Sequence, residues 1–407
     1  MSGAHIVIVG AGHAGGTAAA LLRQFGHEGP VTLIGEEPLP PYQRPPLSKA
    51  WLKGEAGAED LFLKGDGFYA EHGIDLRLST RVKAIDREAQ AVALEGDERL
   101  LYDVLILATG ARARKLPVPG ADLDGVLELR NAADAERLKA ELGPGRRVAV
   151  IGGGYIGLEA AASARALGAE VTVVEREQRL LPRVAGADLS GFFRACHETH
   201  GVRFEIGASV EALAGEAGRV SDVTLADGRM VPCDLALVGV GAQPNLELAQ
   251  AAGLECADGV VVDLEARTSD PAIYAMGDLT WRPLPLYGRM FRLESVPNAL
   301  EQARQAAAAI CGRPAPPPEV PWFWSDQYDL KLQIAGLSFD PDRIVVRGDI
   351  ASGRFAAFHL KDRRILCVEA VNAPAEFMGG RLLIGRRAEV DPDRLADSAI
   401  SMKEVAA

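Results

Sequence analysis

Cysteine is scarce in this sequence, and none precedes Cys196. The five cysteines are odd in number and form no C-x-x-C pair; they are Cys196, Cys233, Cys256, Cys311 and Cys367. Such spacing supports neither a disulfide framework nor a zinc ribbon. The sequence therefore favours a reducing compartment, and we expect the cytoplasm.

The chain also lacks long apolar runs and an excess of positive charge. No uninterrupted apolar stretch reaches the roughly 18 residues of a membrane span, and the opening run at 4–10 (AHIVIVG) is too short for a signal peptide. Lys and Arg number 44 against 56 Asp and Glu, for a net charge of −12, whereas nucleic-acid binders normally carry a basic surface. We therefore expect no membrane and no nucleic acid as partner, although an acidic total leaves room for one local basic face.

What the sequence does contain is ordinary globular composition and abundant glycine. Hydrophobic residues make up 48% and charged residues 25%, which is typical of soluble globular proteins. At about 150 residues per domain, 407 residues predict about two to three domains. A chain of this length buries about three quarters of its surface and needs no structural metal. Glycine accounts for 44 residues, above the usual share of about 7%, which indicates tight turns and backbone close to a ligand.

A series of apolar run, glycine loop, helix, apolar run and acid occurs twice. In the first copy, the run at 5–9 enters the loop at 10–15 (GAGHAG), a helix is predicted at 17–24, and the run at 31–34 leads to Glu36. The loop has the G-x-G-x-x-G spacing of dinucleotide-binding proteins. One such loop alone is also compatible with a plain glycine-rich turn.

The second copy repeats every part of the series. The run at 147–151 enters the loop at 152–157 (GGGYIG), a helix is predicted at 158–167, and the run at 171–174 ends at Glu175. The first glycine permits a tight turn, the second lets backbone approach a pyrophosphate, and the third lets helix and strand pack closely. The helix N-terminus offers N–H groups to the phosphates, and the acid accepts hydrogen bonds from ribose. Two complete copies predict two dinucleotide sites, and hence electron transfer between two cofactors.

The remaining sequence contains two more strand ends and a linker. The segments 101–111 (LYDVLILATGA) and 233–241 (CDLALVGVG) each predict a strand that ends in a glycine turn. The proline-rich segment 314–321 (PAPPPEVP) predicts a stiff extended linker. Beyond it, alternating runs such as 343–347 and 355–360 predict the strands of a smaller α+β domain.

Taken together, these motifs resemble those of the oxygenase-coupled, FAD-dependent NADH–ferredoxin reductases. The resemblance covers essentially the whole chain and rests on an ordered set of segments: 10–16 (GAGHAGG), 41–52 (PYQRPPLSKAWL), 108–112 (ATGAR), 152–159 (GGGYIGLE), 273–278 (IYAMGD), 294–304 (ESVPNALEQAR) and 322–328 (WFWSDQY). No single motif is unique to that family, but the ordered set is specific. It implies an α/β fold with two Rossmann-like dinucleotide-binding domains and a smaller α+β C-terminal domain.

The resemblance also implies a domain order and two cofactors. A discontinuous FAD-binding domain would comprise 1–114 and 242–318, the NADH-binding domain 115–241, and the C-terminal domain 319–407. The first glycine loop would bind FAD and the second NAD(H). The cofactor-binding residues implied are Gly10, Gly12, His13, Ala14, Gly15, Glu36, Arg44, Lys49, Val82, Ala108, Thr109, Gly110, Arg130, Gly152, Gly154, Tyr155, Ile156, Gly157, Glu159, Glu175, Arg176, Arg183, Gly241, Gly277, Asp278, Ser295, Val296 and Trp324.

On the flavin side, three residues have an expected role and a plainer alternative. Arg44 and Lys49 flank the proline-braced segment 45–48, and a cation near the isoalloxazine would stabilise the anionic reduced ring. The alternative is that both are surface charges on a turn. The resemblance implies that Asp278 hydrogen-bonds the ribityl chain, whereas the alternative is a helix N-cap before Leu279.

On the NADH side, the resemblance implies that Tyr155 shields the flavin face until nicotinamide arrives. Glu159 would contact the nicotinamide, and the alternative is an ordinary first-turn Glu favoured by the helix dipole. With Lys49, these two are the expected catalytic residues. Glu175 should accept the ribose 2′-OH and repel a 2′-phosphate, which favours NADH. Arg176 and Arg183 lie close by in sequence and leave some NADPH tolerance open.

The missing cysteines bear on the reaction. Disulfide reductases, peroxidases and single-cysteine NADH oxidases of this fold need a thiolate beside the flavin. Here the corresponding loop, 45–49, reads PPLSK, and no cysteine precedes Cys196. Electrons are therefore expected to leave the flavin directly, to oxygen or to a one-electron carrier.

A docking region for such a carrier is predicted from two features. Trp322 and Trp324 lie on one side of an extended strand, and by resemblance one is near the flavin edge and the other faces the ferredoxin; the alternative is that both are core anchors. Between 282 and 304 the arginines outnumber the glutamates: Arg282, Arg289, Arg292 and Arg304 against Glu294 and Glu301. Such a patch would steer an acidic ferredoxin, and docking is expected near Arg289, Arg292, Arg304 and Trp324. For any single arginine the alternative is solvated surface.

The segment 196–200 (CHETH) is the one metal-like spacing in the chain. It lacks a second ligand cluster, so we interpret it as a solvated helix end and expect no metal. No G-x-S-x-G segment is present, so hydrolysis has no support.

The predicted function is NADH–ferredoxin reduction. NADH would reduce FAD by hydride transfer, and FAD would pass electrons one at a time to a [2Fe–2S] ferredoxin that serves a cytochrome P450 or a ring-hydroxylating oxygenase. One alternative is an NADH oxidase that reduces oxygen. Another is a flavoprotein resembling apoptosis-inducing factor, which would act by binding and would normally carry targeting and basic nuclear-localising stretches.

Overall fold

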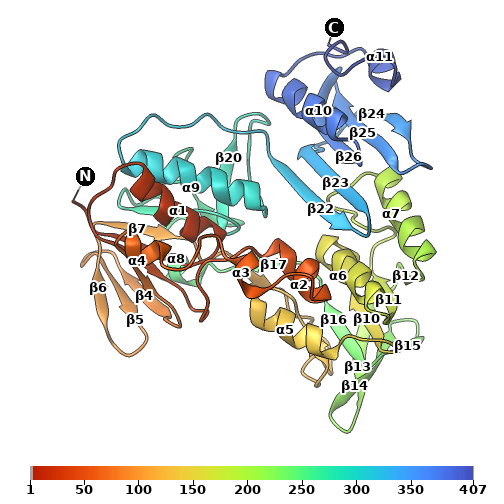
Figure 1. Cartoon of the computed structure of the whole chain (residues 1–407), viewed down its shortest axis with the longest axis horizontal. Helices are drawn as coiled ribbons and strands as arrows, with labels where there is room; N and C mark the ends of the chain where they lie inside the picture. Colours follow the sequence, from red (N-terminus) through yellow and green to blue (C-terminus); the bar gives the residue numbers. More distant parts are fainter. Residues whose placement is uncertain (1–2, 407) are drawn as a thin grey trace. The chain divides into compact units, whose positions relative to one another are not determined.

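The computed structural model describes residues 3–406, which form two compact units. The first unit holds the residues up to Gln43, then Ala58–Arg112 and Gln243–Pro321. The second holds Arg44–Gly57, Ala113–Ala242 and the residues from Trp322 onward. Each unit is built on one of the two glycine-loop series (Figure 1).

The first unit contains a parallel five-stranded sheet in the order β19-β7-β1-β2-β3. Its strands are β1 (Ile6–Val9), β2 (Val31–Ile34), β3 (Ile74–Arg77), β7 (Val104–Leu107) and β19 (Ile273–Ala275). Two helices, α1 (His13–Gln24) and α9 (Val296–Ile310), lie side by side over one face (Figure 1). The first predicted series is thus β1–α1–β2.

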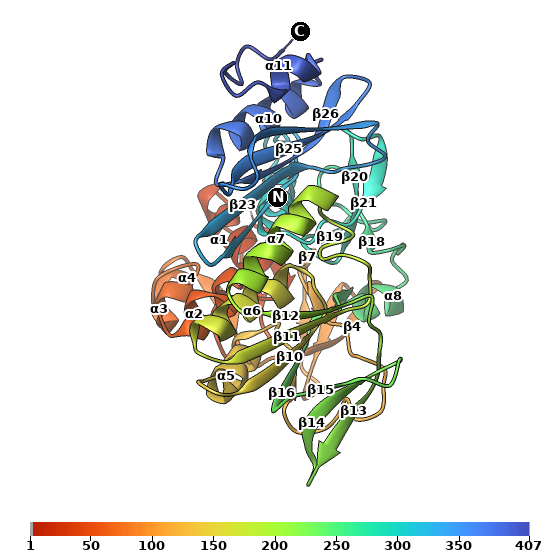
Figure 2. The same cartoon turned by 90° about the vertical axis from the view of Figure 1, so that its right-hand side faces the viewer.

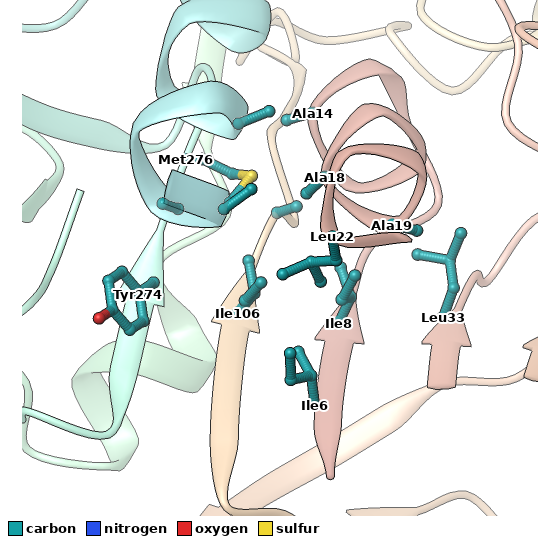
Figure 3. Close-up of a cluster of buried hydrophobic side chains, with 14 of the residues drawn as sticks. Ile6, Ile8, Ala14, Ala18, Ala19, Leu22, Leu33, Ile106, Tyr274 and Met276 are labelled. Atoms are coloured by element: carbon teal, nitrogen blue, oxygen red, sulfur yellow. The ribbon is translucent and has the colours of Figure 1, made fainter. Parts of the chain in front are cut away.

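Alternation along β1 distributes its side chains between the two faces of this sheet. Ile6 and Ile8 are fully buried against Leu22 and Ala18 of α1 (Figure 3). Val7 and Val9 join the cluster on the other face. That second cluster includes residues of an antiparallel sheet with the strands β4 (Val82–Asp86), β5 (Ala91–Leu94) and β6 (Arg99–Leu101).

Short elements complete the first unit. They are the helices α3 (Ala58–Leu61), α4 (Phe68–Glu71) and α8 (Glu247–Ala251), and a three-stranded sheet of β18 (Val260–Val261), β20 (Thr280–Leu284) and β21 (Arg289–Phe291). Two strands lie at the boundaries between the units, β8 (Ala111–Ala113) and β17 (Ala242–Pro244).

The second unit contains its own parallel sheet, in the order β12-β11-β10-β16-β9. The strands are β9 (Val126–Leu127), β10 (Arg147–Ile151), β11 (Glu170–Glu175), β12 (Arg203–Ile206) and β16 (Leu235–Val238). The second predicted series is β10–α6–β11, with α6 at Tyr155–Ala166. The other elements here are η1 (Pro45–Ser48), α2 (Ala50–Lys53), α5 (Ala132–Glu141), and the antiparallel strands β13 (Val210–Glu216), β14 (Arg219–Leu225) and β15 (Met230–Pro232).

The C-terminal part of the second unit is an antiparallel sheet in the order β22-β23-β26-β25-β24. Its strands are β22 (Trp322–Gln327), β23 (Leu330–Gly336), β24 (Arg343–Asp349), β25 (Arg354–Lys361) and β26 (Arg364–Val371), followed by α10 (Pro374–Arg386) and α11 (Pro392–Ala396). The predicted α+β character is confirmed. The three-domain boundaries stay a prediction, because this sheet groups with the residues around β10 in one compact unit.

Helix α7 (Ala187–Thr199) packs between the parallel sheet and the C-terminal sheet of the second unit (Figure 2). Leu189 and Phe193 of α7 pack in one apolar cluster with Leu332 and Phe355 of the C-terminal sheet. The N-cap of α7, Gly186, has no side chain to cap the helix. The N–H of Gly186 itself donates to Oε1 of Glu369 on β26 at 2.8 Å, so one N–H group at the helix start is satisfied from the neighbouring sheet.

Within residues 3–406, none of the helices has the length and apolar character that a bilayer crossing requires.

The core of the first unit gives a stability prediction. Leu22 is fully buried, whereas Leu101 on β6 has 64% of its surface exposed. Leu22→Ala should lower the free energy of unfolding by about 2–5 kcal/mol, because the removal of the Leu22 Cγ, Cδ1 and Cδ2 atoms leaves a buried cavity. Leu101→Ala, the matched control, should change it by less than about 0.5 kcal/mol. Urea denaturation checks both, and equal shifts would contradict the assigned core.

Candidate functional site

The first glycine loop leaves an open cradle at the start of α1. Gly10 has φ +115°, and a Cβ there would lie 2.2 Å from the Ala108 carbonyl oxygen. A Cβ at Gly15 would lie 1.9 Å from the Gly10 oxygen, so the third glycine lets α1 pack on β1. At Gly12, by contrast, no atom lies within 4 Å of a would-be Cβ, and no side chain caps the helix. The cradle therefore fits a phosphate group that accepts N–H bonds at a helix start.

The second loop repeats this geometry at α6. Gly152 has φ +110°, and a Cβ at Gly157 would lie 2.2 Å from the Gly152 oxygen. Gly154 is the uncapped N-cap of α6, again with open space where a Cβ would point. The exposed side chain of Ile156 follows it. The residues of both loops thus fit a dinucleotide pyrophosphate.

The two motif acids have different surroundings. Glu36 is exposed and forms an ion pair with Arg81. Glu175 is buried, and its two carboxylate oxygens accept the N–H of Gly153 at 2.7 Å and the N–H of Glu177 at 2.8 Å. Glu175 therefore fixes the second glycine loop from below, and its role toward a ribose stays a prediction.

The arginines predicted near the second loop differ in placement. Arg176 is exposed and pairs with Glu177 at 2.9 Å. Arg183 is exposed. It lies beside the turn at Gly241, where a Cβ would be 3.5 Å from the Arg183 Nη2.

Lys49 and Glu159 form a largely buried ion pair within the second unit. The Lys49 Nζ donates to Glu159 Oε2 at 2.6 Å, and the Ser48 hydroxyl donates to the same oxygen at 2.5 Å. The Lys49 side chain is 17% exposed and that of Glu159 only 3%. The alternative of a surface charge on a turn is therefore wrong for Lys49, and Glu159 faces a cation in the interior.

The rest of this network was missed from the sequence. The Ser325 hydroxyl on β22 donates to the other Glu159 oxygen, Oε1, at 2.6 Å, and the Ser163 hydroxyl on α6 donates to the Ser48 carbonyl at 2.7 Å. A signal was available for Ser325, because alternation along WFWSDQ places it on the face opposite to Trp324. Its partner Glu159 is 166 positions away, and no sequence pattern links the two.

Two other predicted residues meet near this network. The Arg44 guanidinium donates to the Arg130 carbonyl at 2.6 Å. Arg130 directly precedes the capping box of α5, in which Asn131 and Asp134 bond reciprocally. Arg44 is thus half-buried and anchored to the start of α5 rather than solvated.

Aromatic side chains cover the start of α6 and β22. The Tyr155 ring contacts Phe323 with ring centroids 4.4 Å apart. Trp322 and Trp324 lie on one side of β22, as predicted, with centroids 5.6 Å apart. Trp322 also packs against Phe377 of α10 at 5.9 Å.

The strand-end turns of the first unit hold three more predicted residues, Thr109, Gly277 and Asp278. Thr109 and Asn245 exchange hydrogen bonds, the Thr109 hydroxyl to the Asn245 carbonyl at 3.0 Å and the Asn245 amide to the Thr109 carbonyl at 2.8 Å. The N–H of Gly277 (φ +85°) donates to the Gln302 side chain at 2.9 Å. Asp278 follows directly, and the helix N-cap alternative for it is wrong, because the chain leads into β20 and not into a helix.

Three further positions have plain structural settings. Ser295 is the N-cap of α9, its hydroxyl accepts the Asn298 N–H at 3.3 Å, and Val296 is the first helical residue. The side chain of Val82 is buried in the cluster beneath the sheet, so only its backbone remains for a ligand contact.

One arginine of the predicted basic patch is not on the surface. Arg282 is 2% exposed and forms a buried ion pair with Glu301 at 2.9 Å, with Asn298 as a further acceptor at 2.8 Å. Counting it as a docking charge was wrong, because a buried cation has to be paired with an anion and Glu301 on α9 supplies one.

Of the other three arginines, Arg292 and Arg304 are also paired, and the Arg292 side chain is only 15% exposed. Arg292 pairs with Glu294 and Asp258, Arg304 pairs with Glu319 at 3.0 Å, and Arg289 is exposed. The patch is therefore smaller and more nearly neutral than the sequence count suggested.

The metal-like segment is also corrected in part. His200 is exposed, as a solvated helix end requires, but His197 is fully buried. Its Nε2 lies 2.8 Å from Gln327 Oε1 and its Nδ1 lies 3.0 Å from the Tyr328 hydroxyl. Helical spacing puts His197 one turn above Phe193, on the face that packs against β22 and β23. Within residues 3–406, no group of three or more His, Cys, Asp or Glu is arranged to hold a metal.

Comparison with known proteins assigns both parts of the chain. The family described as pyridine nucleotide-disulphide oxidoreductase matches residues 4–303, and the family described as reductase C-terminal matches residues 322–406. A probable ferredoxin reductase, CtmF, of Castellaniella defragrans is 52% identical over 98% of each chain. Putidaredoxin reductase CamA of Pseudomonas putida is 42% identical over 99% of this chain and 97% of its own.

Solved structures agree with the sequence matches. Putidaredoxin reductase in its covalent complex with putidaredoxin superposes with a TM-score of 0.97, at 42% identity over 99% of this chain and 98% of that one. The ferredoxin reductase of the CYP199A2 system from Rhodopseudomonas palustris superposes with a TM-score of 0.95, at 43% identity over 99% and 100% of the two chains.

The burial of His197 predicts a pH-dependent stability. Burial lowers the pKa of His197 to about 4 from an ordinary value of 6.5. Between those values the unfolded chain binds a proton that the folded protein excludes, so stability is lost as the pH falls from about 6.5 toward 4. The wild type should lose roughly 2 kcal/mol through this group between pH 7 and pH 5.

His197→Gln has no imidazole at this position, so it should not lose stability by this route between pH 7 and pH 5. The difference in unfolding free energy between wild type and variant should therefore change by roughly 2 kcal/mol over that range. Urea denaturation at pH 7, 6 and 5 measures it. The control is His200→Gln, which removes an exposed imidazole one turn away and should leave the wild-type pH dependence in place. Parallel curves for wild type and His197→Gln would contradict the assignment.

Proposed function

The chain belongs to the pyridine nucleotide-disulphide oxidoreductase family, within its ferredoxin reductases, and from that membership we propose that it passes electrons from NADH through FAD, one at a time, to a [2Fe–2S] ferredoxin. It is an NADH-dependent oxidoreductase whose cofactors are FAD and NAD(H). The ferredoxin in turn serves a cytochrome P450 or a ring-hydroxylating oxygenase. The reaction takes place in the cytoplasm.

The observation that carries this proposal is the Lys49–Glu159 pair. Related disulfide oxidoreductases need a thiolate beside the flavin, whereas this loop offers Ser48 and Lys49, both bonded to a buried carboxylate. A cation–carboxylate pair holds no redox equivalents, so it supports direct transfer from the flavin to an external acceptor. The relatives named as ferredoxin reductases favour a ferredoxin over oxygen as that acceptor.

FAD, when bound, supplies hydride acceptance from NADH and release of single electrons. In the first unit, the loop from Gly10 to Gly15 binds its pyrophosphate, Glu36 accepts from its ribose and Asp278 from its ribityl chain. For Glu36 to do so, it has to share its carboxylate with Arg81 or release it. The FAD-binding domain comprises 1–114 and 242–318.

In the second unit, the domain 115–241 binds NADH. The loop from Gly152 to Gly157 binds its pyrophosphate, and Glu175 accepts the ribose 2′-OH with lone pairs that its two backbone bonds leave over. A second anion, such as a 2′-phosphate, would meet that buried carboxylate, which favours NADH over NADPH.

Three side chains act at the reacting centre. Lys49 supplies the positive charge that stabilises electron-rich flavin, Glu159 orients the nicotinamide, and Tyr155 excludes water until the nicotinamide arrives. The ion pair serves both charged groups, because each keeps the other in place in an interior where neither would be stable alone.

Two groups of residues are proposed to meet the ferredoxin. Arg289, Arg292 and Arg304 supply local positive charge, and an acidic partner would compete for it with Glu294, Asp258 and Glu319. Trp324, in the C-terminal domain 319–407, contributes a large aromatic surface.

A panel of [2Fe–2S] ferredoxins, assayed for NADH-dependent reduction with oxygen as the control acceptor, tests the proposal. At least one acidic ferredoxin should be reduced much faster than oxygen, and the rate should fall as salt screens the arginines. If the protein consumed oxygen without ferredoxin as fast as it reduces any ferredoxin, it would be an NADH oxidase instead. Slow turnover with a stable NADH complex would identify a binding flavoprotein.

Lys49→Gln should slow flavin reduction by NADH by on the order of 100-fold, because the negative charge that develops on the flavin loses its cation. FAD binding should weaken far less. Stopped-flow absorbance and the FAD content of the purified protein measure the two effects. Lys53→Gln is the matched control, since Lys53 lies on the surface of α2 and pairs with Glu55; reduction rates in Lys49→Gln that match this control would remove Lys49 from the mechanism.

A further inference from the structure

A continuous chain of hydrogen bonds runs from Glu159 through β22 to α7. Beyond the Ser325–Glu159 bond of 2.6 Å, the Gln327 amide nitrogen donates to the Ser325 hydroxyl at 3.1 Å. The Gln327 amide oxygen lies 2.8 Å from His197 Nε2, and the Tyr328 hydroxyl lies 3.0 Å from His197 Nδ1. All these residues belong to the second unit.

Every bond in this chain has the same direction. Ser325 uses its one hydrogen on Glu159, so it accepts from the Gln327 amide. The amide oxygen of Gln327 is then left to accept from His197 Nε2, which fixes the neutral tautomer with its proton on Nε2. The free Nδ1 accepts from the Tyr328 hydroxyl. Each donor thus points toward the carboxylate, which is the end that carries the negative charge.

The chain is built in the interior. Ser325 and His197 are fully buried, Gln327 is 1% exposed and Glu159 is 3% exposed. Buried polar groups without partners destabilise a fold, so a run of four is kept only where each one satisfies the next. The neutral state of His197 fits this direction, since burial lowers its pKa to about 4.

The charged and titratable neighbours are few at each end. At Glu159, Lys49 and Ser48 donate to Oε2, and the Tyr155 hydroxyl on α6 interacts electrostatically with Glu159 as well as with Glu369 and Cys367 of β26. At His197, the Tyr328 ring lies between it and His200, which stacks on Tyr328 at 3.7 Å. Cys196, half-buried on the same helix, lies near His200.

We propose that Ser325, Gln327 and His197 are positioning residues that orient the Glu159 carboxylate toward the nicotinamide. This rests on the proposed function, because Glu159 is assigned there to the nicotinamide. Lys49 and Ser48 hold Oε2, and the chain holds Oε1, so the plane of the carboxylate is set by two opposed sets of donors. The C-terminal sheet thereby takes part in NADH oxidation without touching the substrate.

A purely structural role predicts a different outcome. If the chain only fastened β22 to α6 and α7, breaking it would lower stability and leave the pH dependence of the reaction alone. If it positions the carboxylate, loss of the donor at Oε1 removes a hydrogen bond to a charged group in the reacting centre, so the rate falls and the acid limb of the pH–rate profile moves to higher pH.

Stopped-flow reduction of the FAD-loaded enzyme by NADH, from pH 5 to pH 9, separates the two. In Ser325→Ala the limiting rate at pH 7 should fall about tenfold, and the acid limb of the pH–rate profile should move up by about one pH unit, each corresponding to one lost hydrogen bond to a charged group. Gln327→Met, which keeps the length of the side chain but neither bond, should shift the limb in the same direction by less. His200→Gln, outside the chain, is the control and should match the wild type.

A second measurement does not depend on activity. The ¹⁵N chemical shifts of the His197 ring should identify a neutral imidazole protonated on Nε2 at pH 7 in the wild type, and the Nε2–H signal should move in Gln327→Met. A ring protonated on Nδ1 or on both nitrogens at that pH would overturn the chain as described.

The outcomes also separate this inference from the proposed function. Wild-type pH–rate profiles in both Ser325→Ala and Gln327→Met, with lowered stability only, would overturn the positioning role. If NADH reduces the flavin but no ferredoxin accepts the electrons, the proposed acceptor is wrong, and shifted profiles in the two variants still support the chain. If NADH does not reduce the wild-type flavin, the proposed function and the positioning role are both wrong.

Discussion

The arrangement of the second unit depends on one buried carboxylate, that of Glu159, and on the groups that hydrogen-bond to it. Removing the Glu159 charge from water is costly unless hydrogen bonds and a counter-charge replace the lost solvent. The donors to Glu159 on α6 come from two distant segments: Lys49 and Ser48 at the end of η1, and Ser325 on β22. Satisfying that charge therefore fixes the positions of an N-terminal loop, a central helix and the C-terminal sheet at once.

Much of the fold could be predicted because short periodic patterns in the sequence indicate its strands and helices. The two series became β1–α1–β2 and β10–α6–β11 because apolar runs, glycine spacing and an alanine-rich helix are local signals. Gly10 and Gly152 could be assigned because only glycine adopts their positive φ this close to a neighbouring strand. The alternating runs beyond the proline-rich linker gave the antiparallel C-terminal sheet for the same reason.

What escaped prediction was the burial of polar side chains. Arg282 looked like a surface charge and His197 like a solvated helix end, because each resembles its exposed neighbours in sequence. Their burial is decided by Glu301 and by Gln327, and the second of these is 130 positions away. Ser325 escaped for the same reason. The sequence therefore pointed to the glycine loops, Lys49 and Glu159, but not to the groups that support them.

The hydrogen bond from the Gly186 N–H to Glu369 has a consequence for biosynthesis. The acceptor for that N–H comes from β26, which the ribosome makes 183 residues later. The beginning of this helix cannot reach its final state on the nascent chain until nearly the whole protein has emerged. Completion of the start of α7 is thus tied to β26, and a chain released before that strand would lack this hydrogen bond.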